Sequence, residues 1–176
     1  MNVSIQGLLR RMEERDLQLV LAWRNHPDVR CFMFNSSEIT WDEHVAWFAS
    51  VSRNARKHLL VYESDDVLLG FVNFSELAGR VVEWGFHAAP QAPKGTGKRM
   101  LGLALEYGFT QLRVHKVSAQ VLEGNPRSLA LHRRLGFTQE GCLREQHCDG
   151  VGYQSVYCFG LLAHEWRIAR EQAKTA

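Results

Sequence analysis

The sequence predicts one mixed α/β domain over residues 1–176, with a central, mostly antiparallel sheet of seven strands, about four flanking helices and a helical tail. Three observations support this fold class. The chain has 176 residues, 45% of them hydrophobic, a size at which one compact core forms. Three strand-like runs in mid-chain are separated only by short turns, which favours an antiparallel meander. A glycine loop then leads into an apolar helix, and a strand, a helix and two more strands follow.

The first part of the chain predicts one strand and one helix. Leu8–Met12 reads as a short strand, and Asp16–Arg24 reads as a helix because its apolar residues recur at helical spacing. Asn25-His26-Pro27 is expected to stop that helix, since proline disfavours helical backbone before it. The segment Arg30–Ile39 is expected to be a loop.

A second helix is predicted to begin at a capping box. Thr40 can cap the helix and Glu43, three residues on, can bond back to it. Val45, Trp47 and Phe48 then supply a buried stripe.

The remaining elements alternate between strands and helices. The predicted strands are His58–Glu63, Val67–Phe74, Arg80–His87, Lys116–Leu122, Gly136–Gly141 and Gln154–Leu162. The predicted helices run from the glycine loop to about Leu112 and from Pro126 to Leu135, and the tail from Ala163 is polar and helix-prone.

The charge balance argues against large polyanionic partners. Lys and Arg number 21 against 19 Asp and Glu, a formal net charge of +2, which is too near neutrality for a dedicated binder of nucleic acid or membrane surfaces. We therefore expect a small-molecule partner. The sequence shows neither a secretory leader nor a long apolar run, so we expect a cytoplasmic location. The oligomeric state stays open, with a homodimer among the options.

The four cysteines predict neither disulfides nor a metal site. No C-x-x-C pair occurs, and a chain without export signals keeps its thiols reduced. Cys142, His147 and Cys148 lie close in sequence, but their spacing matches no recognised zinc motif. We expect scattered free thiols and no metal.

The glycine loop Lys94-Gly95-Thr96-Gly97-Lys98-Arg99 predicts an anion site. Glycine lacks the Cβ that would keep a bulky anion from the backbone N–H groups, and the helix start adds positive potential. An ordinary glycine turn with a solvated basic helix end is the alternative. A P-loop would need glycine at Ala92 and Ser or Thr at Arg99, and a Rossmann fingerprint would need its third glycine two residues before Gly102.

A second motif follows from Asn125 to Phe137. Asn125 is a good N-cap residue, and Pro126 is pre-organised for a first helical turn. Asn125, Ser128 and His132 are spaced by three and four residues, so they lie along one face of the helix. This polar stripe is either a solvent face or part of a site.

Together the two motifs resemble the acetyl-coenzyme A signature of the GNAT family of N-acetyltransferases, over about Leu8 to Leu162. Gly95 and Gly97 match the small positions of the family's pyrophosphate loop, although Ala92 stands where Gln or Arg is usual. The resemblance implies the GNAT fold and acetyl-coenzyme A (acetyl-CoA) as co-substrate.

The later segment resembles the second half of the same signature. Asn125, Ser128, Gly136 and Phe137 match it, whereas His132 stands where the family usually has tyrosine.

Within the family, three stretches look most like the nucleotide-sugar N-acetyltransferases of pseudaminic acid synthesis, a pathway linked to flagellin glycosylation. These stretches are Trp23–Arg30, Ile39–Phe48 and Glu83–Pro90. The implied acceptor is the 4-amino group of a UDP-linked 4-amino-4,6-dideoxy-N-acetyl altrosamine. Ribosomal-protein N-terminal acetyltransferases and spermidine acetyltransferases share the Trp-Arg-Asn opening and Glu140-Gly141, so these acceptors stay open. A non-catalytic acetyl-CoA-binding protein is a further alternative.

The family's reaction is direct attack of an amine on the thioester. Alternation in Arg80–His87 sends Glu83 and His87 to one face and Trp84 to the other. We predict Glu83 as the general base, directly or through water, with a surface carboxylate as the alternative. His132 is predicted to stabilise or protonate the departing thiolate, or otherwise to pack against the cofactor.

The remaining site residues follow from these placements. The predicted cofactor-binding residues are His87, Ala88, Ala89, Lys94, Gly95, Thr96, Gly97, Lys98, Arg99, Asn125, Ser128 and His132, the first three because the family places its oxyanion donor where the fourth and fifth strands splay. The predicted substrate-binding residues are Arg30, Met33, Phe34, Trp41, Asn73 and Ser75, which offer a cation for a diphosphate, rings for stacking and polar groups to orient the amine. Core packing is the alternative for the aromatic rings. The segments Arg30–Ile39 and Arg144–Gly152 are expected to flank the acceptor.

Overall fold

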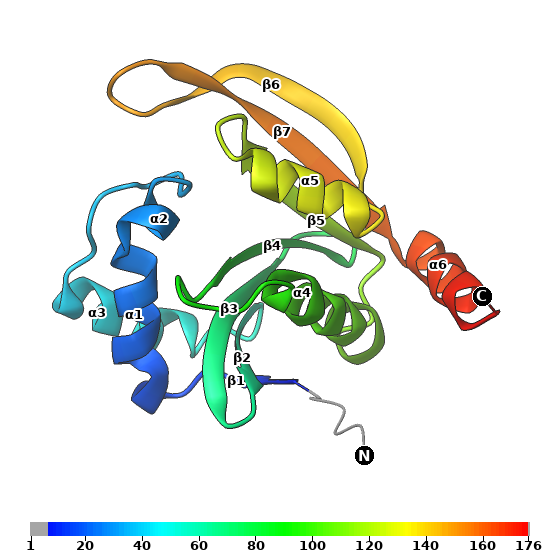
Figure 1. The fold of residues 1–176 in the computed structure, drawn as a ribbon, viewed down its shortest axis with the longest axis horizontal. Helices are drawn as coiled ribbons and strands as arrows, with labels where there is room; N and C mark the ends of the chain where they lie inside the picture. The colour runs from blue at the N-terminus through cyan, green and yellow to red at the C-terminus, as the bar shows by residue number, and fades with distance from the viewer. Residues whose placement is uncertain (1–6, 176) are drawn as a thin grey trace.

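The computed structural model describes residues 7–175, and its centre is one sheet of seven strands in the order β1-β2-β3-β4-β5-β7-β6 (Figure 1). The strands are β1 (Leu8–Arg11), β2 (Lys57–Ser64), β3 (Val67–Glu76), β4 (Val81–Ala88), β5 (Lys116–Leu122), β6 (Thr138–Cys148) and β7 (Tyr153–Leu162). Every neighbouring pair is antiparallel except β4 and β5, which run parallel. The predicted fold class is confirmed. The expectation about a secretory leader rests partly on residues 1–6, which lie outside the described range.

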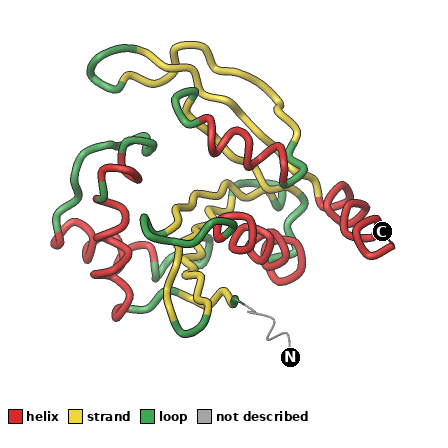
Figure 2. Tube along the Cα trace, viewed as in Figure 1, coloured by secondary structure: helices red, strands yellow, loops and turns green. Residues whose placement is uncertain are grey.

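Helices cover both faces of the sheet (Figures 1 and 2). They are α1 (Leu17–Asn25), preceded by the 3₁₀ turn η1 (Glu14–Asp16), α2 (Pro27–Arg30), α3 (Trp41–Val51), α4 (Thr96–Glu106), continued by the π-helical turn η2 (Tyr107–Gln111), α5 (Pro126–Arg134) and α6 (Ala163–Thr175). α1 and α3 pack on one face of the sheet, and α4 and α5 pack on the other. Among residues 7–175, no helix has the length and apolar character needed to cross a membrane.

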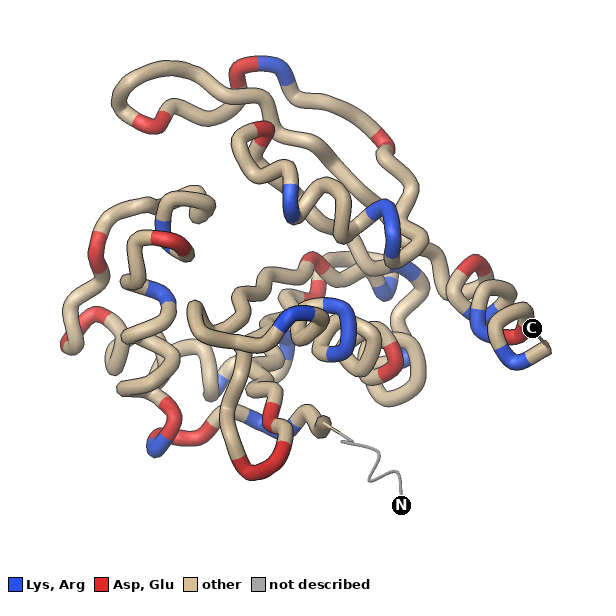
Figure 3. Tube along the Cα trace, in the orientation of Figure 1, with Lys and Arg blue, Asp and Glu red and all other residues tan. Residues whose placement is uncertain are grey.

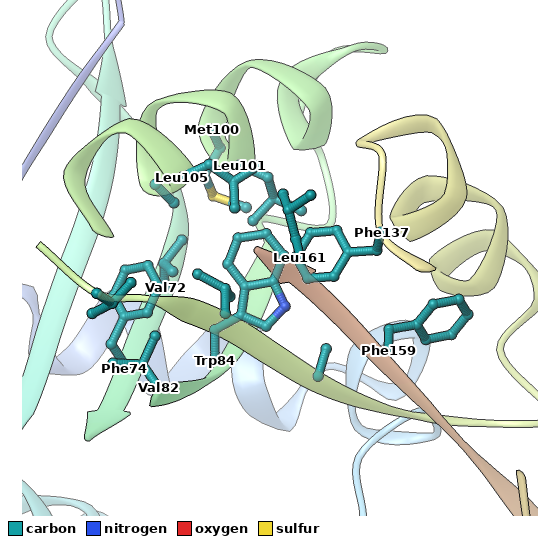
Figure 4. Close-up of a cluster of buried hydrophobic side chains, with 14 of the residues drawn as sticks. Val72, Phe74, Val82, Trp84, Met100, Leu101, Leu105, Phe137, Phe159 and Leu161 are labelled. Carbon is teal, nitrogen blue, oxygen red and sulfur yellow. The ribbon is translucent and has the colours of Figure 1, made fainter. Parts of the chain in front are cut away.

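The larger core lies between the sheet and α4, and the ring of Trp84 is at its centre (Figure 4). Met100 and Leu101 of α4 are fully buried, and Trp84 stacks on Phe137 with ring centroids 5.1 Å apart. Burial of each such side chain contributes about 1.5–3 kcal/mol. The predicted alternation along β4 is confirmed, because Val82 and Trp84 enter this core and Glu83 between them does not.

α3 begins at the predicted capping box. The N–H of Glu43 donates to Thr40 Oγ1 at 3.3 Å, and the N–H of Thr40 donates to the Glu43 carboxylate at 2.7 Å. These bonds satisfy N–H groups that a helix start would otherwise leave free. The predicted stripe of Val45, Trp47 and Phe48 packs against a smaller core shared with α1, β2 and β3.

Two elements differ from the prediction. α1 ends at Asn25 as expected, but Pro27 then starts the extra helix α2, because proline suits a first helical position and His26 Nδ1 accepts the N–H of Asp28 at 3.3 Å. β6 continues to Cys148, well beyond the predicted end at Gly141. Most of β6 is exposed, so it lacks the alternation that marks a half-buried strand.

Candidate active site

The strands β4 and β5 separate after three residue pairs and open a cleft in the middle of the sheet. Their pairing covers only Val81–Glu83 with Lys116–Ser118 among the described residues, while β4 stays paired with β3 to Ala88 and β5 with β7 to Leu122. The cleft has a volume of about 590 Å³. It is bounded by β4, β5, the starts of α4 and α5, and α2 with the loop that follows it.

The start of α4 supplies free backbone N–H groups at one end of the cleft. Gly95 is the N-cap with a φ of 89°, a left-handed conformation that suits glycine. The N–H and hydroxyl of Thr96 both donate to the carbonyl of Pro93, whereas the N–H groups of Gly97 and Lys98 belong to the first turn, which has no intrahelical acceptor. Thr96 and Gly97 line the cleft.

The position of Gly97 fits a pyrophosphate. A Cβ added there would meet only Leu131 Cδ2, at 3.6 Å, which is ordinary contact. The packing of the protein therefore does not require glycine at this position, but close approach of a bulky anion to the backbone does. Lys94, Lys98 and Arg99 flank the same helix start without lining the cleft, and Figure 3 shows this basic stretch.

The start of α5 forms the opposite wall. Asn125 is the N-cap, its Oδ1 accepts the N–H of Ser128 at 3.0 Å, and Pro126 occupies the first helical position. Asn125, Ser128 and His132 all line the cleft, so the polar stripe that the spacing predicts lies along one wall. Arg127 joins them there.

His132 is almost fully buried, with 1% of its surface exposed. The indole N–H of Trp84 donates to His132 Nε2 at 3.1 Å, and His132 Nδ1 lies 2.9 Å from the carbonyl oxygen of Ser128. Burial lowers the pKa of His132 below its ordinary value, against the opposing effect of the Ser128 carbonyl. Both ring nitrogens are thus already hydrogen-bonded inside the protein.

Glu83 lies among polar side chains of β3. Ser75 pairs with Glu83 and Asn73 pairs with Gly85, and all four residues line the cleft. A Cβ on Gly85 would come within 2.7 Å of Asn73 Oδ1, so the glycine makes room for the amide. Lys57 Nζ donates to Ser75 Oγ at 2.7 Å. The predicted base and the two predicted orienting residues are therefore neighbours.

The end of β4 supplies further groups. Three residues that the sequence analysis predicted to bind the cofactor line the cleft here, namely His87, Ala88 and Ala89. The N–H of Ala89 donates to Leu69 on the β3 side, so strand alternation turns the N–H of Ala88 toward the gap left by β5. Burial, with a smaller contribution from Arg24, lowers the pKa of His87 to about 4.

The mouth of the cleft carries three apolar side chains. Phe32, Met33 and Phe34, which follow α2, line it. The ring of Phe34 meets that of His147 edge-on with centroids 5.5 Å apart. His147 lies on the hairpin of β6 and β7, so the two segments predicted to flank the acceptor contact each other across this mouth.

Two predicted substrate residues lie elsewhere. Arg30 has a 3.6 Å ion pair with Glu38, and Trp41 begins α3 with 49% of its surface exposed. The structure places neither on the cleft lining. The spacing of residues within a loop does not reveal which side chains turn inward.

The cleft also contains residues that the sequence analysis did not single out. These are Asp28, Val29, Phe32, Gln120, Leu122 and Arg127, among others. The sequence could have indicated Arg127 as a site residue. A cation in the first turn of a helix opposes the helix dipole, so its presence there indicates a neighbouring anion. Gln120 and Leu122 become visible only once β5 is known to splay from β4. Among the described residues, no group of three or more His, Cys, Asp or Glu side chains could hold a metal ion.

Residues 7–138 match the family model described as acetyltransferase (GNAT) domain. The chain belongs to the GNAT family of acetyltransferases. It is an N-acetyltransferase, and GNAT enzymes use acetyl-CoA as the acetyl donor. The co-substrate of this domain contains a pyrophosphate. The glycine loop at α4, beside the cleft between β4 and β5, fits such an anion.

Two kinds of curated GNAT relatives are similarly close. The chain is 26% identical to the acetyltransferase PseH of Campylobacter jejuni over 148 residues, which cover 80% of this chain and 93% of that protein. It is 28% identical to the spermidine N(1)-acetyltransferase of Vibrio cholerae over 158 residues, which cover 88% of this chain and 91% of that protein. A crystal structure of the V. cholerae enzyme in complex with CoA and spermine superposes with a TM-score of 0.86 at 27% identity, covering 92% of this chain and 98% of that one.

Proposed function

We propose that this GNAT enzyme acetylates the 4-amino group of a UDP-linked 4-amino-4,6-dideoxy sugar of the N-acetyl altrosamine type. The observation that carries the proposal is the composition of the cleft mouth beside α2. Phe32 and Phe34 are 41% and 47% exposed there and offer flat apolar faces for a base or a sugar ring. The similarity to PseH supports the same acceptor class.

Charge on the lining supports an acceptor that is not a polycation. Of the residues lining the cleft in the described part of the chain, Asp28 and Glu83 are the carboxylates. We assign Glu83 to proton removal, which leaves Asp28 to meet a second positive charge. A polyamine carries several ammonium groups and would need more acidic partners than that.

In the proposed reaction the amine nitrogen attacks the thioester carbonyl directly. Glu83, on β4 beside the start of the splay, accepts the proton from the attacking nitrogen, either directly or through a water held by Asn73 and Ser75. The N–H of Ala88 faces the gap and stabilises the oxyanion. The N–H groups at Gly97 and Lys98 hold the pyrophosphate, which fixes the donor in attacking geometry.

A spermidine-type acceptor is the second candidate. The specific observations in its favour are the similarity to spermidine acetyltransferases in sequence and fold, and Asp28 at the cleft mouth. Under this alternative, Asp28 and Glu83 would bind the ammonium groups of one linear amine.

The experiment that separates the two candidates compares kcat/KM for a UDP-4-amino sugar, spermidine and an N-terminal peptide. We expect the UDP-amino sugar to be the best acceptor. A Phe34→Ala variant should raise KM for the sugar nucleotide, by about tenfold if the ring stacks on the base, and leave spermidine turnover unaffected. A higher kcat/KM for spermidine than for every UDP-amino sugar tested would overturn the acceptor assignment and leave acetyl transfer itself intact.

A further inference from the structure

The hydrogen bonds of His132 determine which of its nitrogens carries the proton. An indole N–H can only donate a hydrogen bond, so His132 Nε2, 3.1 Å from Trp84 Nε1, must present a lone pair. A carbonyl oxygen can only accept, so Nδ1, 2.9 Å from the carbonyl oxygen of Ser128, must carry the hydrogen. The Ser128 hydroxyl, 3.4 Å from Nδ1, can accept as well as donate, so all three contacts agree with one neutral tautomer.

A second proton on His132 has no place in this arrangement. Protonation of Nε2 would set its N–H against the N–H of Trp84, and neither group could turn toward another acceptor without leaving its packing. The surroundings also disfavour charge, because the ring lies among Trp84, Phe86, Phe137 and Phe159 at centroid distances of 5.1–5.7 Å. Arg133 follows His132 on α5, and its guanidinium lies over the neighbouring Phe159, 5.9 Å from the centre of that ring.

The same bond joins the two halves of the cleft. Trp84 lies on β4 and His132 on α5, which forms the opposite wall with Asn125 and Ser128. β4 and β5 are paired directly only up to Glu83 and Ser118, so beyond that point the two halves need other ties. The buried Trp84–His132 bond is such a tie, one residue from the proposed base.

The geometry points to His132 as a positioning residue that sets the width of the cleft through Trp84, and not as the proton donor to the departing sulfur. This inference deepens the proposed acetyl transfer and rests on it. In the transfer, the nitrogen–carbon bond forms, the amine proton passes to Glu83 and the carbon–sulfur bond breaks with both electrons going to sulfur. The thiolate leaves unprotonated and takes a proton from water afterwards, which is feasible because an ordinary thiol has a pKa of about 8.5.

Matched variants separate positioning from acid catalysis. The side-chain carbonyl of glutamine can reach the place of Nε2 and accept the Trp84 N–H, but glutamine is no acid; phenylalanine offers neither function. We expect His132→Gln to keep kcat within about threefold of the wild type and His132→Phe to lower it on the order of 10- to 10²-fold, with an unchanged pH profile in both. Trp84→Phe should lower kcat about as much as His132→Phe does. The double variant should lower kcat little further than either single variant.

An acid role predicts the reverse pattern. His132→Gln and His132→Phe would then lower kcat equally, and the limb of the pH profile that belongs to the acid would disappear. Trp84→Phe would change kcat little, because it frees Nε2. That result would overturn the inference.

A measurement without substrates keeps the inference testable even if His132→Phe or Trp84→Phe fails to fold or no acceptor is found. Nitrogen-15 NMR of the full-length wild-type chain, labelled at its eight histidines, reports the protonation of each ring nitrogen, and loss of one signal set in His132→Gln assigns His132. We expect an unprotonated Nε2 and a protonated Nδ1 that do not change between about pH 6 and pH 9. A proton on Nε2, or titration within that range, would refute the tautomer. Failure of every amine to be acetylated would instead refute the proposed function and leave the NMR result standing.

Discussion

Asn25 uses both ends of its side-chain amide on the backbone of Ile39. Its Nδ2 donates to the Ile39 carbonyl at 2.8 Å, and its Oδ1 accepts the Ile39 N–H at 2.9 Å. Next to it, the guanidinium of Arg24 donates to the carbonyls of Ser37 and Asn35. The last residues of α1 therefore hold the far end of the loop that carries Phe34 to the cleft mouth.

This anchor predicts a selective effect on the acceptor. Asn25→Ala removes two hydrogen bonds, each contributing about 0.5–1.5 kcal/mol, and should loosen the loop. We expect KM for the acceptor to rise about five- to tenfold while the dissociation constant of acetyl-CoA stays unchanged in calorimetry. Asn54→Ala is the matched control, because Asn54 Oδ1 accepts the N–H of Arg56 in a turn that does not line the cleft. An equal rise in KM for the acceptor in both variants would show that the loop does not take part in acceptor binding.

The glycine loop predicts a charge effect on cofactor binding. Gly97→Asp places a carboxylate where the pyrophosphate should lie, with little strain because the position is open apart from Leu131. We expect the acetyl-CoA dissociation constant to rise at least about tenfold from like-charge repulsion. Gly102→Asp adds the same charge to the same helix at an exposed glycine with open space around it, and should bind normally. Normal binding by folded Gly97→Asp would contradict the loop assignment.

Removal of the proposed base should slow the chemical step. Glu83→Gln is expected to lower kcat on the order of 10²-fold or more, with a smaller loss at high pH, where more of the amine is already deprotonated. Glu76→Gln removes a carboxylate from the neighbouring strand that bonds His58 and does not line the cleft, so its kcat should stay near normal. A normal pH–rate profile for Glu83→Gln would assign proton removal to water, either from the bulk or held by Asn73 and Ser75.

Buried histidines predict a loss of stability in mild acid. The pKa of His87 is lowered from 6.5 to about 4 by burial, so between these values the unfolded chain binds more protons than the folded one. Stability that is fully present above about pH 6.5 is therefore lost as the pH falls toward 4, by roughly 3 kcal/mol from this residue. His44 and His132, whose pKa values burial also lowers, act in the same direction.

Urea denaturation at pH values from 7.5 to about 4.5 checks this. His87→Leu should flatten the dependence of the unfolding free energy on pH, because it removes the buried imidazole. Burial raises the pKa of Asp16, but the hydrogen bonds from Arg10 and the Glu13 N–H outweigh it and lower the pKa, so the stability that this carboxylate provides is lost only at more acidic pH. An unchanged slope in His87→Leu would show that this histidine is not buried as a neutral ring.

Local patterns predicted most of the fold because they act within a few residues. The strand Lys116–Leu122 was predicted to the residue, and the Thr40–Glu43 capping box is present. α2 was missed because four residues are too few to show a period. The length of β6 was missed because its outer part is held by pairing with β7 and not by burial of one face.

The candidate site was less predictable because it depends on contacts between distant segments. Alternation along β4 correctly separated Glu83 from Trp84, since that is a local property. The bond from Trp84 to His132 spans 48 residues, and neither residue shows it in sequence. The sequence likewise does not show where the side chain of Arg30 lies. Arg30 pairs with Glu38 and does not line the cleft, because of how α1 holds the loop.

The most direct test of the central claim is the initial rate of coenzyme A thiol release by the full chain, measured while both acetyl-CoA and a UDP-4-amino sugar are varied. Direct transfer predicts no release without amine, one thiol for each acetylated amine, and reciprocal plots that intersect because both substrates must be bound together. Thiol release without an amine, or parallel plots that indicate an acetyl-enzyme, would contradict the mechanism. Absence of release with every UDP-amino sugar, polyamine and peptide tested, despite tight binding of acetyl-CoA, would contradict the assignment of acetyltransferase activity.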